Sequence, residues 1–240
     1  MTSKEAMRPF GLALESYFNG NKDAKIIFHR DDGQQTEDFI KGYFRTYSDF
    51  SEHEKIAINE SKGKILDIGA GVGPHSLELQ KRGFEVLAID ISEKACEIMK
   101  DRGLKRVICA DPYEIEGENF DTILIMGCSI AFVENLDGLQ RFLKYSKTLL
   151  NQNGIILMDS RDVRRTDNPE HIKYQDNNIK AGRYRGEIRV KIEYNDILGE
   201  MFTILHIDPD KLNLIANNSN WKCKILHKYE DNGLYLAKLS

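Results

Sequence analysis

The chain has 240 residues and a formal net charge of −4 at pH 7, with 41% hydrophobic and 30% charged residues. This composition predicts a globular protein with a sizeable core, and the slight acidity excludes a globally basic surface for nucleic acid or membranes. No apolar run reaches the roughly 18 residues of a transmembrane helix. The N-terminus has no apolar signal segment and the cysteines are scattered, so we expect a reduced, cytoplasmic protein without membrane contact.

Residues 1–60 are expected to form a flank or lid beside the main domain. Apolar residues at helical spacing over 3–20 predict an amphipathic helix, and segments 25–30 and 34–39, separated by an Asp-Asp-Gly turn, predict a β-hairpin. Arg45 is the one candidate for ligand binding here, because a guanidinium can bind a carboxylate through two parallel hydrogen bonds. The alternative interpretation of Arg45 is an ordinary surface ion pair.

From residue 61 onwards, apolar strands alternate with helices. Strands are expected at 64–69, 84–91, 106–111, 120–128 and 154–160, with helices between them. Near-continuous apolar strands of this kind are typical of a parallel sheet that helices cover on both faces. We therefore expect a doubly wound, mostly parallel α/β domain over residues 61–240.

Two antiparallel hairpins are expected to complete the chain. Residues 187–194 alternate strictly between apolar and polar side chains and predict a half-buried strand, with its hairpin partner at 200–207. This added hairpin belongs to an inserted region, 161–207, and could form a dimer edge or a lid. A second hairpin at the C-terminus is expected at the sheet edge, which brings the main sheet to seven strands.

The most informative stretch is residues 64–73, with the sequence KILDIGAGVG. A short apolar strand ends in three glycines at alternate positions, and Pro74 then fits the first turn of a helix. Glycines let the backbone approach a ligand because no Cβ intervenes, and because some turn positions require a positive φ. The dinucleotide fingerprint GxGxxG is not completed in either register, which disfavours a nicotinamide oxidoreductase.

The pattern over Asp67–Gly73 resembles motif I of the class I S-adenosylmethionine (SAM)-dependent methyltransferases. The resemblance continues in chain order over residues 61–160. Asp90 ends the second strand, where that family places the acid that accepts hydrogen bonds from both ribose hydroxyls. Asp111 matches the acid near the adenine amino group, and Phe120-Asp121 opens the fourth strand as in the family's motif IV.

This resemblance implies a Rossmann-like fold, SAM as the cofactor and S-adenosylhomocysteine (SAH) as the product. Asp159 could be a metal ligand, but Cys128 and Ser129 offer it no partner, so no metal is expected. Arg45 joins the expected cofactor site as a carboxylate clamp. The expected site comprises Asp67, Gly69, Ala70, Gly71, Gly73, Asp90, Ile91, Asp111, Pro112, Met126, Gly127 and Arg45.

Three side chains are candidates for a catalytic role. His75 follows the glycine loop, and Cys128 and Asp159 lie at the carboxyl ends of the fourth and fifth strands, where ligands of open α/β sheets bind. A packed histidine and a buried thiol are the alternatives for His75 and Cys128. The family's DPPY or NPPY motif of DNA amino-group methylases is absent, as is the Pro-Cys of pyrimidine C5 enzymes.

The acceptor is expected to be a small, anionic molecule, because basic residues outnumber acidic ones over 161–191. The alternative interpretation of this segment is a solvated basic loop. The candidate acceptor residues are Arg161, Tyr174, Arg183 and Tyr184. Arginine and tyrosine together also suit RNA, so an RNA methyltransferase is the second hypothesis. A SAM-binding protein without catalysis is the third. The sequence leaves a monomer and a homodimer open.

Overall fold

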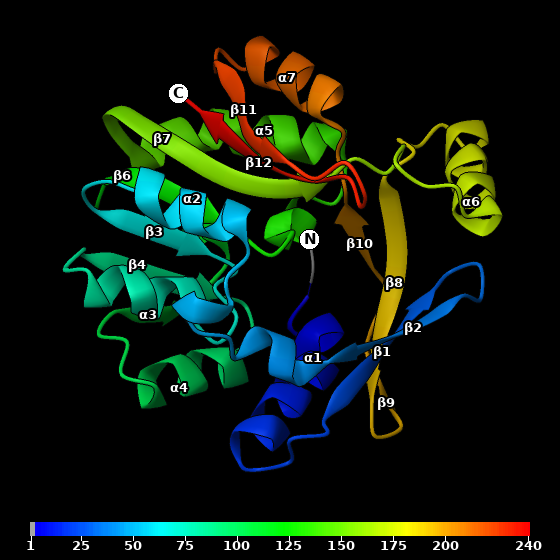
Figure 1. The fold of residues 1–240 in the computed structure, drawn as a ribbon, viewed down its shortest axis with the longest axis horizontal. Coiled ribbons are helices and arrows are strands. Elements are labelled where there is room, and N and C mark those ends of the chain that lie inside the picture. Colours follow the sequence, from blue (N-terminus) through cyan, green and yellow to red (C-terminus); the bar gives the residue numbers. More distant parts are fainter. Residues whose placement is uncertain (1–2) are drawn as a thin grey trace.

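The core of the protein is a sheet of seven strands in the order β11-β12-β7-β6-β3-β4-β5 (Figure 1). The structure is a computed structural model and describes residues 3–240. The strands are β3 (Ile65–Ile68), β4 (Val86–Asp90), β5 (Val107–Cys109), β6 (Phe120–Ile125), β7 (Leu150–Arg161), β11 (Cys223–Lys228) and β12 (Leu234–Leu239). Strands β3 to β7 pair in parallel, and β12 runs antiparallel between β7 and β11. The expected doubly wound α/β sheet is confirmed.

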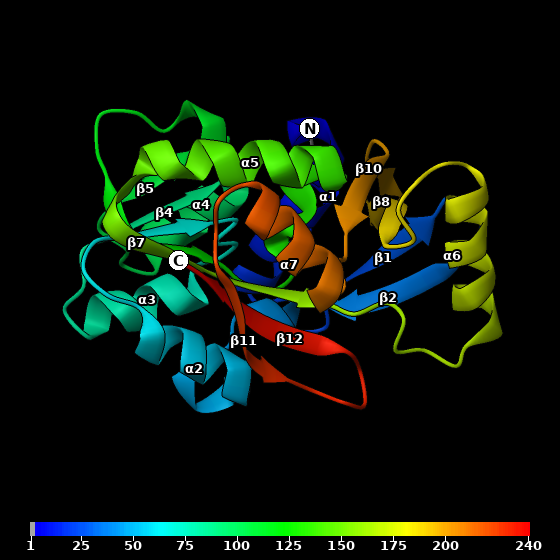
Figure 2. The same ribbon diagram turned by 90° about the horizontal axis from the view of Figure 1, so that it is seen from above.

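Helices cover both faces of this sheet, because successive strand residues point to opposite sides. They are α2 (Glu52–Glu60), α3 (Pro74–Lys81), α4 (Glu93–Asp101), α5 (Leu136–Leu149) and α7 (Pro209–Asn218). Leu66 and Ile68 belong to the cluster that buries α5 and α7, whereas Ile65 belongs to the cluster that buries α2 and α3. Figure 2 shows the two helix pairs on opposite sides of the sheet.

Short polar side chains fix where several helices begin. Asn135 accepts a hydrogen bond from the Gly138 backbone N–H (2.8 Å) at the start of α5. Asp208 accepts one from the Lys211 N–H (2.9 Å) at the start of α7, directly before Pro209. These caps satisfy N–H groups that the helix itself leaves unpaired, so the sequence specifies the helix starts locally.

A second, smaller sheet stands beside the main one and has the order β10-β8-β1-β2, with β9 paired to β8. Its strands are β1 (Lys25–Arg30), β2 (Gln35–Phe39), β8 (Glu187–Tyr194), β9 (Ile197–Leu198) and β10 (Phe202–Leu205). All of its pairings are antiparallel. The expected hairpins over 25–39 and 187–207 are both present, but they join into one sheet. Helix α1 (Lys4–Phe18) packs against the inner face of that sheet.

This joining places one strand of the 187–207 hairpin inside the second sheet and the other at its edge. Strand β8 has a hydrogen-bonded partner on each side, β1 and β10. The edges of the second sheet are therefore β2 and β10. The sequence did not predict this because strands so far apart in the chain carry no local signal for their pairing.

The remaining elements connect these layers. Helix α6 (Pro169–Lys180) belongs to the inserted region 161–207 and lies at the outer end of the second sheet (Figure 1). Short 3-10 turns occur at η1 (Ile40–Tyr43), η2 (Tyr47–Asp49), η3 (Pro112–Glu114) and η4 (Ser129–Val133). Over residues 3–240, no helix combines the length and the apolar character needed to cross a membrane.

Candidate functional site

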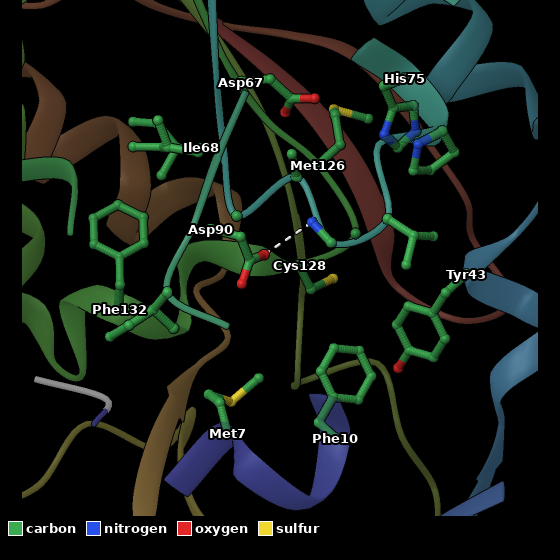
Figure 3. A pocket seen from close by; sticks show the side chains of 18 of the residues that line it. Met7, Phe10, Tyr43, Asp67, Ile68, His75, Asp90, Met126, Cys128 and Phe132 are labelled. Carbon is green, nitrogen blue, oxygen red and sulfur yellow. Dashed lines mark hydrogen bonds between the residues drawn. The ribbon is translucent and has the colours of Figure 1, made fainter. Parts of the chain in front are cut away.

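A cavity of about 430 Å³ lies between the carboxyl ends of β3, β4 and β6 and the inner face of the second sheet (Figure 3). Pockets that bind small molecules generally measure about 300–1,000 Å³. One half is built by the glycine loop and the strand ends. The other is built by α1, the turns η1 and η4, and the strands β1, β2, β8 and β10. The two halves differ in their chemistry.

The glycine loop adopts the left-handed conformation that its sequence predicts. Gly69, Gly71 and Gly73 have φ values of 67°, 58° and 75°. A Cβ atom on Gly71 would meet no protein atom within 4 Å, so it would project into open space at the pocket. A Cβ on Gly73 would instead lie 2.6 Å from the Cδ1 atom of Leu104. Gly71 therefore keeps room for a ligand, and Gly73 keeps room for the packing behind the loop.

All of the expected cofactor residues except Gly73 line the pocket. Gly73 begins α3 from its left-handed conformation and is buried. Gly73 therefore lies behind the lining of the pocket, against Leu104. The sequence could not separate Gly71 from Gly73, because both positions need the same backbone conformation.

Asp90 connects the glycine loop to the end of β4. Its carboxylate accepts hydrogen bonds from the backbone N–H groups of Gly71 (2.9 Å) and Ser92 (2.8 Å), the first of which Figure 3 shows. Burial raises the pKa of Asp90 to about 6, against these two favourable bonds. The carboxylate thus holds the loop and also lines the pocket.

Two more acids support this half of the pocket. Asp67 is buried at the end of β3, where it accepts a hydrogen bond from the Ser76 hydroxyl (2.6 Å), and burial raises its pKa. Asp111 accepts a hydrogen bond from the Tyr113 N–H (2.9 Å) and so fixes the turn η3. Both side chains are positioned by their own local contacts before any ligand binds.

Glu54 joins two residues that the sequence suggested separately. Arg45 donates to both of its carboxylate oxygens, at 2.7 and 2.8 Å, and the His75 Nε2 atom lies 2.8 Å from Glu54 Oε1. Burial would raise the pKa of Glu54, but hydrogen bonds from His75, Arg45 and Ser51 hold it well below its usual range. Glu54 also accepts a hydrogen bond from the Ser51 hydroxyl (2.6 Å) in the capping box that begins α2.

Arg45 and His75 both line the pocket, yet each already has this carboxylate partner. The carboxylate that Arg45 binds in this structure is therefore that of Glu54. The Nε2 atom of His75 is likewise engaged, which favours the packing interpretation over a free base. Phe50 packs against the His75 ring with centroids 4.8 Å apart.

Asp159 fixes the loop that follows β6 and does not line the pocket. It accepts hydrogen bonds from the backbone N–H groups of Cys128 (2.6 Å) and Gly127 (3.0 Å), and the His53 Nε2 atom lies 3.3 Å away. Cys128 has a φ of 55°, which is uncommon for a residue with a side chain. The geometry gives Asp159 a positioning role for a strained loop in place of direct contact with a ligand.

Cys128 lines the pocket, but its surroundings oppose a nucleophilic role. Burial and the nearby Asp159 raise the pKa of the Cys128 thiol well above its usual value. A thiol must lose its proton to become a strong nucleophile. The buried-thiol interpretation is therefore the one that the structure favours.

The opposite half of the pocket is mostly apolar and aromatic, and no pattern in the sequence predicted that its residues would line a pocket. Its lining residues are Met7, Phe10, Phe28, Asp38, Tyr43, Phe132, Ile192, Phe202 and Ile204. Alternation along 187–194 placed Ile192 on the buried side of its strand. Nothing in the sequence showed that this side would face the glycine loop.

The four expected acceptor residues do not reach the pocket. Tyr174 donates a hydrogen bond to Asp31 (2.8 Å), and Tyr184 donates one to Asp208 (2.5 Å). Their contacts link segments of the chain to one another. The other two, Arg161 and Arg183, donate hydrogen bonds to the Asn232 carbonyl (3.2 Å) and to Asn178 Oδ1 (3.0 Å). Segment 161–207 meets the pocket through apolar residues of β8 and β10 instead.

The glycine-loop half has the groups that SAM requires. A cofactor with a ribose offers two hydroxyl donors, and the Asp90 carboxylate is a pure acceptor. The open space beside Gly71 admits a ligand against the main chain. Among residues 3–240, no three His, Cys, Asp or Glu side chains converge as metal ligands would.

Residues 65–154 match the family model described as a methyltransferase domain. The structure is similar to that of a SAM-dependent methyltransferase from Bacteroides fragilis in complex with S-adenosyl-L-homocysteine. The TM-score is 0.84 and the identity 30%, and the match covers 98% of this chain and 95% of that one.

Curated relatives match over shorter regions. A glycine/sarcosine N-methyltransferase from Halorhodospira halochloris is 28% identical over 153 residues, or 55% of this chain and 57% of that protein. A tRNA (guanine(37)-N(1))-methyltransferase from Aspergillus fumigatus is 25% identical over 104 residues, or 42% of this chain and 22% of that protein. The matched region thus covers about half or less of these two relatives.

Proposed function

The chain belongs to the class I SAM-dependent methyltransferase family, and from this premise we propose that it transfers a methyl group from SAM to a small molecule. The observation that carries the proposal is that one pocket joins the glycine loop to a mostly apolar and aromatic wall. The glycine-loop half suits the cofactor, and the apolar half suits an acceptor of limited size. A relative and a structural neighbour with methyltransferase names support the reaction class.

The chain's own residues position the reactants and exclude water. When bound, SAM supplies an activated methyl group on a positively charged sulfur. Asp90 holds the glycine loop in place, and Asp159 holds the loop after β6, so side-chain hydrogen bonds position both loops before binding. Correct placement of two reactants can lower a barrier by roughly 7–11 kcal/mol. A general base is not required for every acceptor.

Several features favour a small molecule over RNA. RNA-binding surfaces present exposed basic residues and aromatic side chains on which bases stack. Here the aromatic side chains Phe10, Phe28 and Phe202 line an internal pocket. The only Arg or Lys among its lining residues within 3–240 is Arg45, which Glu54 already binds.

The test is a methyl-transfer assay with SAM that carries a labelled methyl group. Separate reactions receive a pool of small metabolites and total tRNA, and both SAH formation and the labelled product are measured. We expect label in the small-molecule fraction and none in RNA. Asp90→Asn should abolish transfer, whereas the exposed Asp101→Asn should retain it.

Three results would contradict the proposal. Label in RNA alone would replace the small acceptor with a nucleic acid. Binding of SAM in isothermal titration, with no SAH formed from either pool, would favour a SAM-binding protein without catalysis. Failure to bind SAM or SAH at all would reject the cofactor site itself.

A further inference from the structure

We propose that the acceptor carries a positively charged amino group on an apolar body, and that Asp38 binds this group. The inference deepens the proposed function and rests on it, because it concerns the acceptor half of the same pocket. It replaces the anionic acceptor expected from the sequence. Three observations on Asp38 and its surroundings support it.

The first observation is the direction in which Asp38 faces. Its register partner on β1 is Ile26, which is fully buried on the inner face of the second sheet. Asp38 itself lines the pocket. Its neighbour Glu37 is exposed and pairs with Lys25 at 2.6 Å. The chain therefore places one partly buried acid on the inner side of the edge strand β2, where a charged group is more stable with a partner of opposite charge.

The second observation is that Asp38 has only part of its bonding capacity satisfied. The Tyr43 hydroxyl donates a hydrogen bond to Asp38 Oδ2 at 2.6 Å. Among residues 3–240, no lysine, arginine or histidine forms an ion pair with Asp38, and its Oδ1 atom accepts no hydrogen bond. Tyr43 remains a neutral donor, because burial and the nearby Asp38 raise its pKa well above the usual value. The carboxylate thus keeps one oxygen available to a ligand at the pocket.

The third observation is the aromatic surroundings of this charge. Phe10 packs edge to face against Tyr43 with ring centroids 4.9 Å apart, and Phe28 and Phe202 line the same half. Aromatic faces attract cations and repel anions, and their apolar surface favours a ligand with a hydrocarbon body. An ammonium group beside Asp38 would meet both a carboxylate and these rings. An anionic acceptor would meet the carboxylate with no free cation to offset it.

The test compares three probes of matched shape on protein saturated with SAH. The probes are 2-phenylethylamine, 2-phenylethanol and phenylacetate, which differ mainly in the charge of one terminal group. We expect the amine to bind about tenfold more tightly than the alcohol, because a hydrogen bond between charged groups is stronger than a neutral one. The carboxylate probe should bind most weakly. Affinities are measured by isothermal titration.

Matched variants decide whether Asp38 is responsible. Asp38→Asn keeps the shape of the side chain and should remove the preference for the amine over the alcohol, while the affinity for SAH stays unchanged. Glu37→Gln, on the outer face of the same strand, should leave the preference intact. SAH binding also reports that each variant is folded.

The outcomes separate this inference from the proposed function. SAH binding without a preference for the amine, or a preference that survives Asp38→Asn, would overturn the inference and leave the methyltransferase proposal standing. The absence of binding by all three probes at millimolar concentration would overturn it equally. Loss of SAH binding by the unaltered protein would instead reject the proposed function.

Discussion

The carboxylate of Asp90 both holds the backbone of the glycine loop and lines the candidate cofactor site. Its two oxygens hold the Gly71 and Ser92 N–H groups, and its side chain is 8% exposed at the pocket. Burial raises its pKa to about 6. A group with a raised pKa in the folded state stabilises the fold at low pH and loses that contribution as the pH rises through about 6. The ionised carboxylate of Asp90 is therefore less favourable in the folded protein without a ligand than in the unfolded chain.

This raised pKa predicts how cofactor affinity depends on pH. The ribose hydroxyls donate hydrogen bonds to a carboxylate, so binding favours the ionised Asp90 and releases its proton below pH 6. The affinity for SAH should rise about tenfold from pH 5 to pH 7 and then level off. Isothermal titration across this range measures the effect. Asp90→Asn should bind weakly with no such slope, and an equal slope in that variant would assign the titration to another group.

At the scale of elements, the turn between β3 and α3 separates two reasons for a glycine. Gly71 and Gly73 both have positive φ, at 58° and 75°. Only at Gly73 would a Cβ collide with the protein, 2.6 Å from Leu104 and 3.1 Å from Met99. Gly71 therefore leaves open space at the pocket, and Gly73 allows close packing against Leu104 and Met99.

Alanine substitutions should separate these roles. Gly73→Ala should lower the free energy of unfolding by about 2–4 kcal/mol, because it adds a collision to the strain of a left-handed residue. Gly71→Ala should cost only about 1 kcal/mol in stability but remove most of the SAH affinity, since its Cβ enters the pocket. Denaturant unfolding and SAH titration on both variants check this. Equal loss of stability in the two variants would contradict the assignment.

Local sequence patterns predicted the helices and strands better than they predicted which of these elements lie side by side. The strand, glycine turn and helix around Asp67–Gly73 depend on residues next to one another in the chain, so the pattern predicted both the structure and the position at the pocket. Arg45 and His75 were suggested for separate reasons, and only the fold shows that Glu54 binds both. The sequence also favoured the arginines of 161–191 on charge alone. Arg161 instead donates to the distant Asn232 carbonyl and Arg183 to the nearby Asn178 side chain, and charge alone predicted neither bond.

At the scale of the whole molecule, the pocket is an interface between two sheets. The main sheet contributes the cofactor half, and α1 with the second sheet contributes the apolar half. A ligand that contacts the folded state on both sides is lost when the protein unfolds. Binding should therefore stabilise the complete fold and not merely the glycine loop.

This predicts a thermal shift that also tests the choice of cofactor. SAH at a hundred times its Kd should add about 2.7 kcal/mol, which corresponds to a rise in Tm of roughly 5–10 °C for a chain of this size. NAD at the same concentration should leave Tm unchanged, because the loop does not complete the dinucleotide fingerprint. Differential scanning fluorimetry measures both. A larger shift with NAD would contradict the SAM assignment.

The pairing of β1 with β8 sets an order of events during synthesis. His29 and Glu193 face one another at 2.6 Å across that pair and lie 164 residues apart in the chain. At about 5–20 residues per second, a ribosome needs on the order of ten seconds or more to supply the partner strand. The glycine loop and most of the main sheet emerge during that delay, while the edge of β1 stays unpaired. The nascent chain thus passes through a stage in which the glycine loop is present and the apolar half of the pocket is incomplete. During that stage one edge of β1 is open to mispairing.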